Sequence, residues 1–194
     1  KYSKFYRGTL YDLGCGEAPF KKYFLQYCDK YVGVDWDNSI HNLQADIICN
    51  LNQEFNIENS VADTIISISV MEHLSEPQNF LNETYRILKP DGYLILAVPW
   101  QMEIHEAPYD YFRFTKYGLE HLLTKAGFSD IKIEATNGFF TTIIIKFNYF
   151  TYRFVRSKKL TRKQKLIKAI LKPIWYLGQK IAPILDKIDI YPEY

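Results

Sequence analysis

Residues 10–20, LYDLGCGEAPF, constrain the fold more than any other part of the sequence. A predicted apolar strand ends beside Asp12 and leads into a turn that contains Gly14 and Gly16. Glycine tolerates positive φ angles and carries no side chain, so the backbone of this turn can approach a ligand closely. The helix expected next presents unpaired N–H groups at its start, which favour a polar or negatively charged ligand group. The stretch therefore predicts a nucleotide-type ligand site at the end of a buried strand.

Strands and helices are predicted to alternate after this turn. The predicted strands are residues 31–35, 44–49, 61–70, 93–98 and 131–135, and the predicted helices are residues 19–28, 77–88 and 115–126. Thr115 suits a helix N-cap, and Gly127 suits a helix end. The order predicts an α/β fold with a Rossmann-like, open, mostly parallel sheet and helices on both faces.

The C-terminal part differs from this core. Residues 139–154 contain three consecutive isoleucines that favour a strand, but their apolar residues follow helical spacing, and we favour a helix. Residues 161–185 are predicted to be helical, kinked or divided at Pro173 and Pro183. We therefore expect residues 1–137 to form the core. Residues 138–194 are expected to form a basic, mainly helical extension, or an insertion before a last strand that the sequence does not clearly show.

Charge is distributed unevenly along the chain. Residues 153–180 carry ten Lys or Arg and no Asp or Glu, which leaves 14 basic and 22 acidic residues elsewhere. This basic segment is open to three interpretations: a solvated charged face, a helix on an anionic membrane surface, or, less favoured, a nucleic-acid contact. The membrane interpretation covers residues 153–185, with Trp175 and Tyr176 at the interface.

Three cysteines without metal-type spacing favour free thiols in a reducing, cytoplasmic location. No apolar run reaches the 18 residues that a membrane-spanning helix needs. The first residue is Lys1 and not Met, so we expect a chain trimmed from a longer one. The oligomeric state is not encoded in any pattern that we recognise.

Five segments, in the same order, match one family. DLGCG, VGVD, ADI, ISVMEHL and LKPDGYLILAVP together resemble the motifs of class I S-adenosylmethionine-dependent methyltransferases of the small-molecule, type 11-like group. The resemblance covers roughly residues 9–135. The later stretch HEAPYDYFRFTKYGLEHLLTKAGF resembles a subgroup met near polysaccharide and cell-surface biosynthesis. Together the two resemblances imply methyl transfer from S-adenosylmethionine to a small-molecule or lipid- or saccharide-linked acceptor, with O-methylation favoured.

The resemblance also implies cofactor contacts. Asp35, which lies 23 residues after Asp12, would accept from the ribose hydroxyls, Trp36 would pack on adenine, and Asp46 would accept from its amino group. The implied cofactor residues are Asp12, Gly14, Cys15, Gly16, Asp35, Trp36, Asp46, Ile47, Ser69 and Val70. The sequence departs from the family at Asp91, where glycine is usual, and at Asn50, where Asp is frequent.

Two histidines are candidate general bases. Imidazole titrates near neutral pH, so His73 or His105 could take a proton from an acceptor hydroxyl, although His73 could equally brace the helix after its strand. Tyr109 and Arg113 are candidate substrate residues; Arg113 could clamp an anionic group or instead pair with Asp110. No metal is expected, because no Asp, His or Cys cluster has ligand spacing along the chain.

Other functional classes fit less well. A nicotinamide dehydrogenase would need a third glycine where Pro19 and Phe20 stand. A non-catalytic cofactor-binding module remains the alternative to an enzyme, and an RNA methyltransferase that uses the basic segment is a second alternative.

Overall fold

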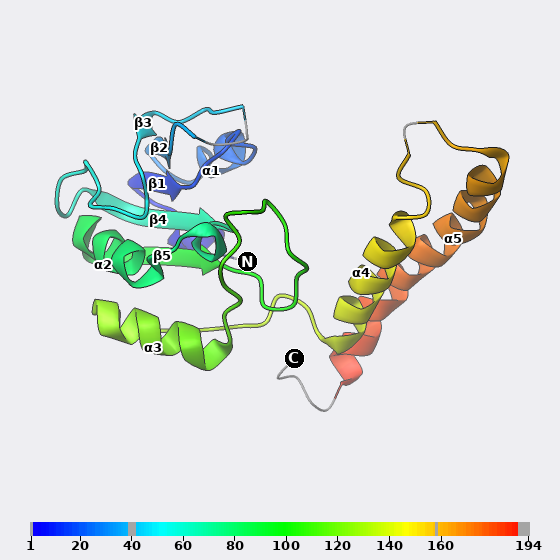
Figure 1. Cartoon of the computed structure of the whole chain (residues 1–194). Helices are drawn as coiled ribbons and strands as arrows, with labels where there is room; N and C mark the ends of the chain where they lie inside the picture. Colours follow the sequence, from blue (N-terminus) through cyan, green and yellow to red (C-terminus); the bar gives the residue numbers. More distant parts are fainter. Residues whose placement is uncertain (1, 39–41, 158, 190–194) are drawn as a thin grey trace. The chain divides into compact units, whose positions relative to one another are not determined.

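The computed structural model describes residues 2–38, 42–157 and 159–189. By its internal contacts the chain forms two compact units, Lys1–Lys132 and Ile133–Tyr194, which are treated separately below. The first unit contains the sheet, and the second contains α4 and α5 (Figure 1).

The sheet of the first unit has five parallel strands in the order β3-β2-β1-β4-β5. They are β1 (Thr9–Leu13), β2 (Lys30–Asp35), β3 (Ile47–Ile48), β4 (Ala62–Ile68) and β5 (Leu88–Ala97). The chain builds outward from β1 to β3 and then returns to place β4 on the other side of β1 (Figure 1). In open α/β sheets, such a reversal leaves a crevice for ligands at the carboxyl ends of the strands. The glycine turn follows β1 at this point.

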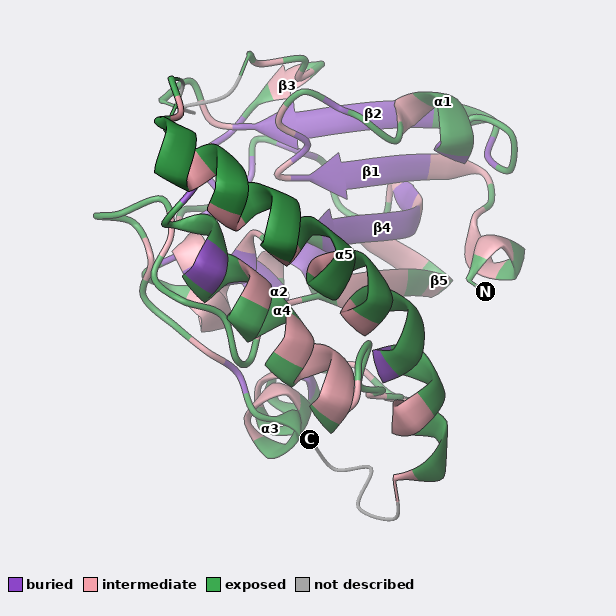
Figure 2. Cartoon of the chain, turned by 90° about the vertical axis from the view of Figure 1, so that its right-hand side faces the viewer, coloured by how far each residue is buried: buried purple, intermediate pink, exposed green. Residues whose placement is uncertain are grey.

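Both faces of the sheet are covered by apolar side chains, as the alternation of a strand requires. On one face Leu13, Val34 and Ile65 pack in a cluster that also contains Phe80 and Leu123, from α2 (Pro77–Ile87) and α3 (Lys116–Ala126). On the other face Leu10, Tyr31 and Ile66 pack with Phe24, from α1 (Lys21–Phe24). Figure 2 shows β1, β2 and β4 as the buried centre. The predicted fold class is therefore confirmed for the first unit.

The predicted boundaries of α3 agree with the structure, whereas both boundaries of the first predicted helix differ. Thr115 caps α3 by accepting the N–H of Gly118, and Gly127 ends it with a φ of 104°. The helix predicted over residues 19–28 is much shorter, because Gln26 and Tyr27 donate to carbonyls three residues back and form turns instead. Short 3-10 helices, η1 (Ser3–Phe5) and η2 (Met71–His73), complete the unit.

Three predicted strands were wrong in extent or existence. Strand β5 begins at Leu88, five residues before the start of the strand predicted over residues 93–98. The strand predicted over residues 44–49 is reduced to β3, because only Ile47 and Ile48 join the ladder of β2. Residues 131–135 form no strand, since no described segment pairs with them. Ile131 nevertheless packs against the core, so its apolar pattern reflects burial without a strand partner.

The second unit is a helical hairpin of α4 (Phe139–Tyr152) and α5 (Arg162–Leu185), followed by η3 (Asp186–Ile188). The helical interpretation of residues 139–154 is thus confirmed. Helix α5 runs without division through Pro173 and Pro183. The indole of Trp175 donates to Thr151 at 2.8 Å, and Asp186 accepts the N–H of Phe140 at 2.8 Å near the start of α4. Among the described residues, no helix is long and apolar enough to cross a membrane.

Candidate functional site

The glycine turn after β1 is held against the end of β2. Gly14 and Cys15 both donate to the carbonyl of Val34, at 2.8 and 3.1 Å. Gly14 has a φ of 81°, and a Cβ added there would lie 2.2 Å from a methyl carbon of Val70. Both the backbone angle and the space therefore require glycine at this position. Gly16 also has a positive φ, of 51°.

Two carboxylates lie at the ends of the neighbouring strands β1 and β2. Asp35 accepts the N–H of Gly16 at 2.7 Å through Oδ2 and the N–H of Trp36 at 2.8 Å through Oδ1. Each oxygen keeps a further lone pair, so the carboxylate can still accept from a ligand. Asp12 is buried, and its Oδ2 accepts a hydrogen bond of 2.7 Å from the phenol of Tyr31.

Burial makes the region of Asp12 unfavourable for negative charge. Desolvation raises the pKa of Asp12 to about 6; the Tyr31 hydrogen bond opposes this, and the charge of Asp35 adds to it. Burial, followed by the charges of Asp35 and Asp12, raises the pKa of the Cys15 thiol to about 12. A positively charged ligand group near Asp12 and Asp35 would relieve this repulsion. The site therefore suits a cation beside the glycine turn.

Trp36 connects the end of β2 to the long loop after β5. Its ring lies 5.5 Å from that of Tyr109, with the planes at 88°. The expected adenine-packing residue and one expected substrate residue are thus in contact.

Asp46, the acid expected to face adenine, is engaged within the sheet. Asp46 precedes β3 and accepts the N–H of Gly33 at 2.8 Å, with Lys21 Nζ 3.7 Å away. It is level with the middle of β2, because Ile47 pairs with Val34 and only then does Ile48 reach Asp35. This placement makes Asp46 a brace between strands. Asn50, two residues beyond β3, accepts the N–H of Asn52 at 3.0 Å through Oδ1 and keeps its side-chain NH₂, and the sequence reasoning noted it only as a departure.

Ser69 and Val70 follow β4 on the opposite side of β1. Ser69 has a φ of 54° and donates its N–H to Ala97 at 2.9 Å, which ties the ends of β4 and β5 together. Val70 fills the space over Gly14. Val70 thus borders the glycine turn, and the cofactor contacts implied for Ser69 and Val70 stay a prediction.

The two candidate bases come together, although they are 32 residues apart in the sequence. The carbonyl of Glu72, in η2, accepts the N–H groups of Tyr111 and Phe112 at 2.8 and 3.2 Å, which docks the loop on η2. The rings of His73 and His105 then lie 4.7 Å apart. Nε2 of His73 is 3.8 Å from Oε1 of Glu72, and Nε2 of His105 is 3.9 Å from the same oxygen.

The partners of Nδ1 determine the tautomer of each ring. Nδ1 of His73 lies 2.7 Å from the carbonyl of Tyr109, and Nδ1 of His105 lies 3.2 Å from the carbonyl of Glu103. A carbonyl only accepts, so Nδ1 carries the proton, and Nε2 of each neutral ring presents a lone pair. Both lone pairs are on the nitrogens nearest Glu72.

Arg113 is fully engaged by its own loop. Its five N–H groups donate to both oxygens of Asp110, at 2.6 and 2.8 Å, and to the carbonyls of Met102, Glu103 and Phe112. This pair holds the pKa of Asp110 far below its usual range. Of the two roles predicted for Arg113, pairing with Asp110 is the one in the structure. No donor is left over for an anionic substrate group.

Glu72 is the residue that the sequence reasoning missed most clearly. Its side chain is completely buried, and neither carboxylate oxygen accepts a hydrogen bond from another described residue. Burial raises its pKa, while the backbone N–H of Glu72 itself and then the charges of His73, His105 and Arg113 lower it. That N–H is too poorly placed to count as a hydrogen-bond partner by geometry. An acid directly before a histidine at the end of a buried strand was the available signal. The reasoning against a metal must also be corrected, because the fold supplies a ligand cluster that spacing along the chain did not reveal.

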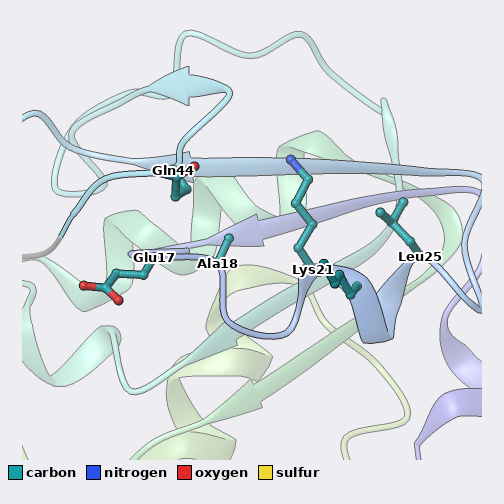
Figure 3. A pocket seen from close by; sticks show the side chains of 6 residues that line it. Glu17, Ala18, Lys21, Leu25 and Gln44 are labelled. Carbon is teal, nitrogen blue, oxygen red and sulfur yellow. The ribbon is translucent and has the colours of Figure 1, made fainter.

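A pocket of about 360 Å³ lies beside the glycine turn, lined by Glu17, Ala18, Lys21, Lys22, Leu25 and Gln44 (Figure 3). None of these residues is among the expected cofactor contacts. The hydrogen bond from Gln44 N to the carbonyl of Gly16, 3.0 Å long, connects the pocket wall to the turn. Two lysines line this pocket, whereas the candidate cofactor residues Asp12 and Asp35 supply only negative charge.

Comparison with known proteins agrees with this geometry. A family model described as a methyltransferase domain, of type 11, matches residues 11–96. A probable S-adenosylmethionine-dependent methyltransferase of Mycolicibacterium smegmatis is 25% identical over 141 residues, which are 66% of this chain and 54% of that protein. The chain thus spans about half the length of this curated relative.

Two solved structures share the fold. A SAM-dependent methyltransferase from Archaeoglobus fulgidus has a TM-score of 0.59 at 16% identity, and the match covers 92% of this chain and 83% of that one. The 1,6-didemethyltoxoflavin-N1-methyltransferase of Burkholderia thailandensis, solved with 1,6-didemethyltoxoflavin and S-adenosylhomocysteine, has a TM-score of 0.55 at 18% identity, covering 68% and 65%. Residues 11–96 therefore match a methyltransferase-domain family model, and the relatives named above that share sequence or fold with this chain are S-adenosylmethionine-dependent methyltransferases.

Proposed function

We propose that this protein transfers a methyl group from S-adenosylmethionine to a small-molecule or lipid- or saccharide-linked acceptor, at an oxygen atom. The observation that carries the proposal is the pair of carboxylates, Asp12 and Asp35, on either side of the Gly14 turn. A cofactor with a positive sulfonium and an ammonium group matches the acidic pair, and a ribose matches the remaining lone pairs of Asp35.

Different residues at the carboxyl edge of the sheet would contact different parts of the cofactor. Gly14 and Gly16 let the backbone pass close to the cofactor, and Trp36 offers a flat apolar surface for adenine. We assign the polar contact to adenine to Asn50 in place of Asp46, because Asn50 lies at the carboxyl edge and Asp46 does not. S-adenosylmethionine supplies the activated methyl group, so the chain's own contribution is to orient the acceptor and exclude water.

A proton must leave an acceptor hydroxyl when its oxygen is methylated. Nε2 of His73 and of His105 are the lone pairs placed to take it, since Nδ1 of each ring is committed to a carbonyl. The same donor–acceptor pattern keeps both rings fixed in orientation. Tyr109 lies between the two ends of the site, because its ring contacts Trp36 and its carbonyl accepts from His73. We assign Tyr109 to positioning of the acceptor.

We further propose that the hairpin of α4 and α5 contacts an anionic lipid surface, which would bring a lipid-linked acceptor to the enzyme. Exposed apolar side chains lie along α5, among them Leu166, Ile170, Ile174, Tyr176, Leu177, Ile181 and Ile184. Figure 2 shows most of this helix exposed. The surrounding Lys and Arg are complementary to negatively charged headgroups.

Calorimetry with S-adenosylmethionine and with S-adenosylhomocysteine tests the cofactor assignment. Both should bind with one site per chain, and absence of binding by either would overturn the proposal. Turnover is then measured as release of S-adenosylhomocysteine in the presence of lipid, saccharide or RNA fractions. Binding without turnover in every fraction would favour the non-catalytic module, and turnover only with RNA would favour an RNA methyltransferase.

The lipid contact is tested by flotation with liposomes. The protein should float with vesicles that contain phosphatidylglycerol and remain at the bottom with purely zwitterionic ones. Changing Lys163, Lys168 and Lys172 to Glu should abolish flotation, whereas the same exchange at Lys116 and Lys125, on α3, should not. If the triple variant of α5 floats as well as the double variant of α3, the assignment of the contact to α5 is refuted.

A further inference from the structure

We propose that Glu72, His73 and His105 bind one divalent transition-metal ion of the zinc type. One carboxylate oxygen and one nitrogen from each ring lie within 4.8 Å of one another. Two of these groups come from η2 after β4, and the third comes from the loop after β5, so the cluster is formed only by the folded chain. The set is a carboxylate and two imidazoles, which is a common ligand set for such ions.

The strongest support is the state of Glu72. A carboxylate that is removed from water normally has hydrogen-bond donors or a cation as partners, because an unpaired buried charge costs free energy. The Glu72 side chain is 0% exposed, yet neither of its oxygens accepts a hydrogen bond from another described residue. Its Oε1 instead faces two ring nitrogens at 3.8 and 3.9 Å, beyond hydrogen-bond distance.

The orientation of the two rings points to the same occupant. Because Nδ1 of each histidine faces a carbonyl, each neutral ring presents the lone pair of Nε2 on the side of Glu72. Three lone pairs therefore converge on one point, and none of the three groups offers a hydrogen to the others. A metal ion satisfies all three at once, and it does so with both histidines in the neutral form that metals bind.

The surroundings of the rings resemble those of metal ligands. Metal-bound histidines usually donate their other N–H to a carbonyl or carboxylate, which fixes the ring. His73 does so to Tyr109, and His105 does so to Glu103, with Asp110 Oδ2 at 3.5 Å from the same Nδ1. Asp110 is itself held by the bidentate pair with Arg113 and by the N–H of His105 at 2.8 Å. The loop thus positions His105 through two further residues.

Binding requires only small movements. Zinc bonds to nitrogen and oxygen are about 2.0–2.1 Å long, so the oxygen and nitrogen atoms 3.8–3.9 Å apart must close by roughly 0.5 Å to reach tetrahedral spacing. The two ring nitrogens lie within 4.8 Å of each other and must close by at most about 1.5 Å. The side chains of His73 and His105 are 16% and 23% exposed, which gives an ion a path from solvent. Three protein ligands leave a coordination position open for an oxygen ligand. An ion at this position would exclude Nε2 of either ring as a general base, so the two roles are alternatives for the same atoms.

Calorimetric titration of the full chain with zinc chloride tests the inference directly. The protein is prepared without a histidine tag and freed of metal by dialysis against a chelator. We expect one zinc ion per chain, and we expect cobalt(II) at the same site to give visible absorption bands that zinc displaces. His73→Ala and His105→Ala should each weaken zinc binding at least 100-fold, and Glu72→Gln should weaken it at least tenfold.

The matched control is His121→Ala, which removes an exposed histidine from α3 and should bind zinc like the unchanged protein. Circular dichroism verifies that each variant is folded, and the partly exposed His105 gives the variant least at risk. Unchanged affinity in folded His105→Ala, or no zinc binding by the folded unchanged protein, would overturn the inference. Neither result bears on the cofactor assignment, because S-adenosylmethionine binding is measured separately on metal-free protein. A bound zinc ion would replace the role of His73 and His105 as general bases.

Discussion

The phenol of Tyr31 donates a hydrogen bond of 2.7 Å to Oδ2 of Asp12, and both residues are buried. The two side chains come from adjacent parallel strands, β2 and β1, and they meet beneath the glycine turn. Burial raises the pKa of Asp12 to about 6, and the Tyr31 hydrogen bond limits that rise by favouring the charged form. The charge of Asp12 therefore depends on its hydrogen bond with Tyr31 as well as on its burial.

This relationship predicts a pH-dependent affinity for S-adenosylmethionine. The cationic cofactor should bind the ionised form of Asp12 better, so affinity should rise between pH 5 and 7 and level off above the pKa of about 6. The folding stability of the cofactor-free protein should change in the opposite direction, falling as the pH rises. The stability contributed by a neutral Asp12 is complete below its ordinary pKa of 3.8 and is lost as the pH rises through 6. Calorimetry and urea unfolding across this range measure the two effects.

Tyr31→Phe should raise the pKa of Asp12 further and lower the affinity for the cofactor at pH 7 by about two- to tenfold, as the ionised fraction of Asp12 falls. A hydrogen bond to a charged group is worth about 1.5–3 kcal/mol, and 1.4 kcal/mol corresponds to a factor of ten. Tyr117→Phe, which changes an exposed tyrosine on α3, is the control and should leave the affinity unchanged. If Tyr31→Phe binds as tightly as the control across the whole pH range, the link between Tyr31 and Asp12 has no role in binding.

Three substitutions distinguish cofactor contacts from strand braces. Asp35→Asn should weaken cofactor binding by at least tenfold, because it removes the charge and one acceptor at the carboxyl edge. Asn50→Ala should weaken binding several-fold and lower the free energy of unfolding by about 1 kcal/mol, since it removes the acceptor of the Asn52 N–H. Asp46→Asn should leave the affinity nearly unchanged but lower the free energy of unfolding by about 1 kcal/mol, since it weakens the bond to Gly33 N. A larger affinity loss in Asp46→Asn than in Asn50→Ala would restore Asp46 as the adenine contact.

The core of the fold could be predicted because local patterns agree with it. The apolar runs around Leu13, Val34 and Ile65 specify buried strands, and Thr115 and Gly127 mark the ends of α3 by their own chemistry. Residues 131–135 misled the prediction because alternation reports one buried face, whereas a strand also needs a hydrogen-bonded neighbour. That neighbour is a property of the whole sheet.

The candidate site could be predicted only where its residues are local. The turn from Asp12 to Gly16 and the end of β2 at Asp35 are each contained in one short motif. The cluster of Glu72, His73 and His105 depends on how the loop after β5 docks on η2, which no spacing along the chain reveals. The roles of Arg113 and Asp46 likewise depended on their partners, because a guanidinium or carboxylate binds whichever group the fold brings nearest.

The cysteines should be unreactive in the folded protein. All three are buried, and burial raises the pKa of each thiol, that of Cys15 to about 12. The thiolate is the reactive form, so only about one Cys15 in ten thousand would be ionised at pH 8. Labelling with iodoacetamide at pH 8 should be slow for the native protein and complete for three thiols in urea. Rapid modification of Cys15 in the native state would show that the turn opens readily.

Gly14 should tolerate no side chain unless Val70 is also reduced. In Gly14→Ala the new Cβ would lie 2.2 Å from Val70 Cγ2, and the backbone would keep its φ of 81°. The clash and the strained angle together should lower the free energy of unfolding by about 2–4 kcal/mol. Val70→Ala removes the methyl carbons that clash, so the double variant should be more stable than the sum of the two single changes predicts. The strain of the angle, about 1 kcal/mol, and a tight contact of 3.1 Å with the retained Cβ of position 70 then remain at position 14. Urea unfolding of all four proteins completes the cycle. Strict additivity would mean that the contact of Gly14 with Val70 does not determine the residue at this turn.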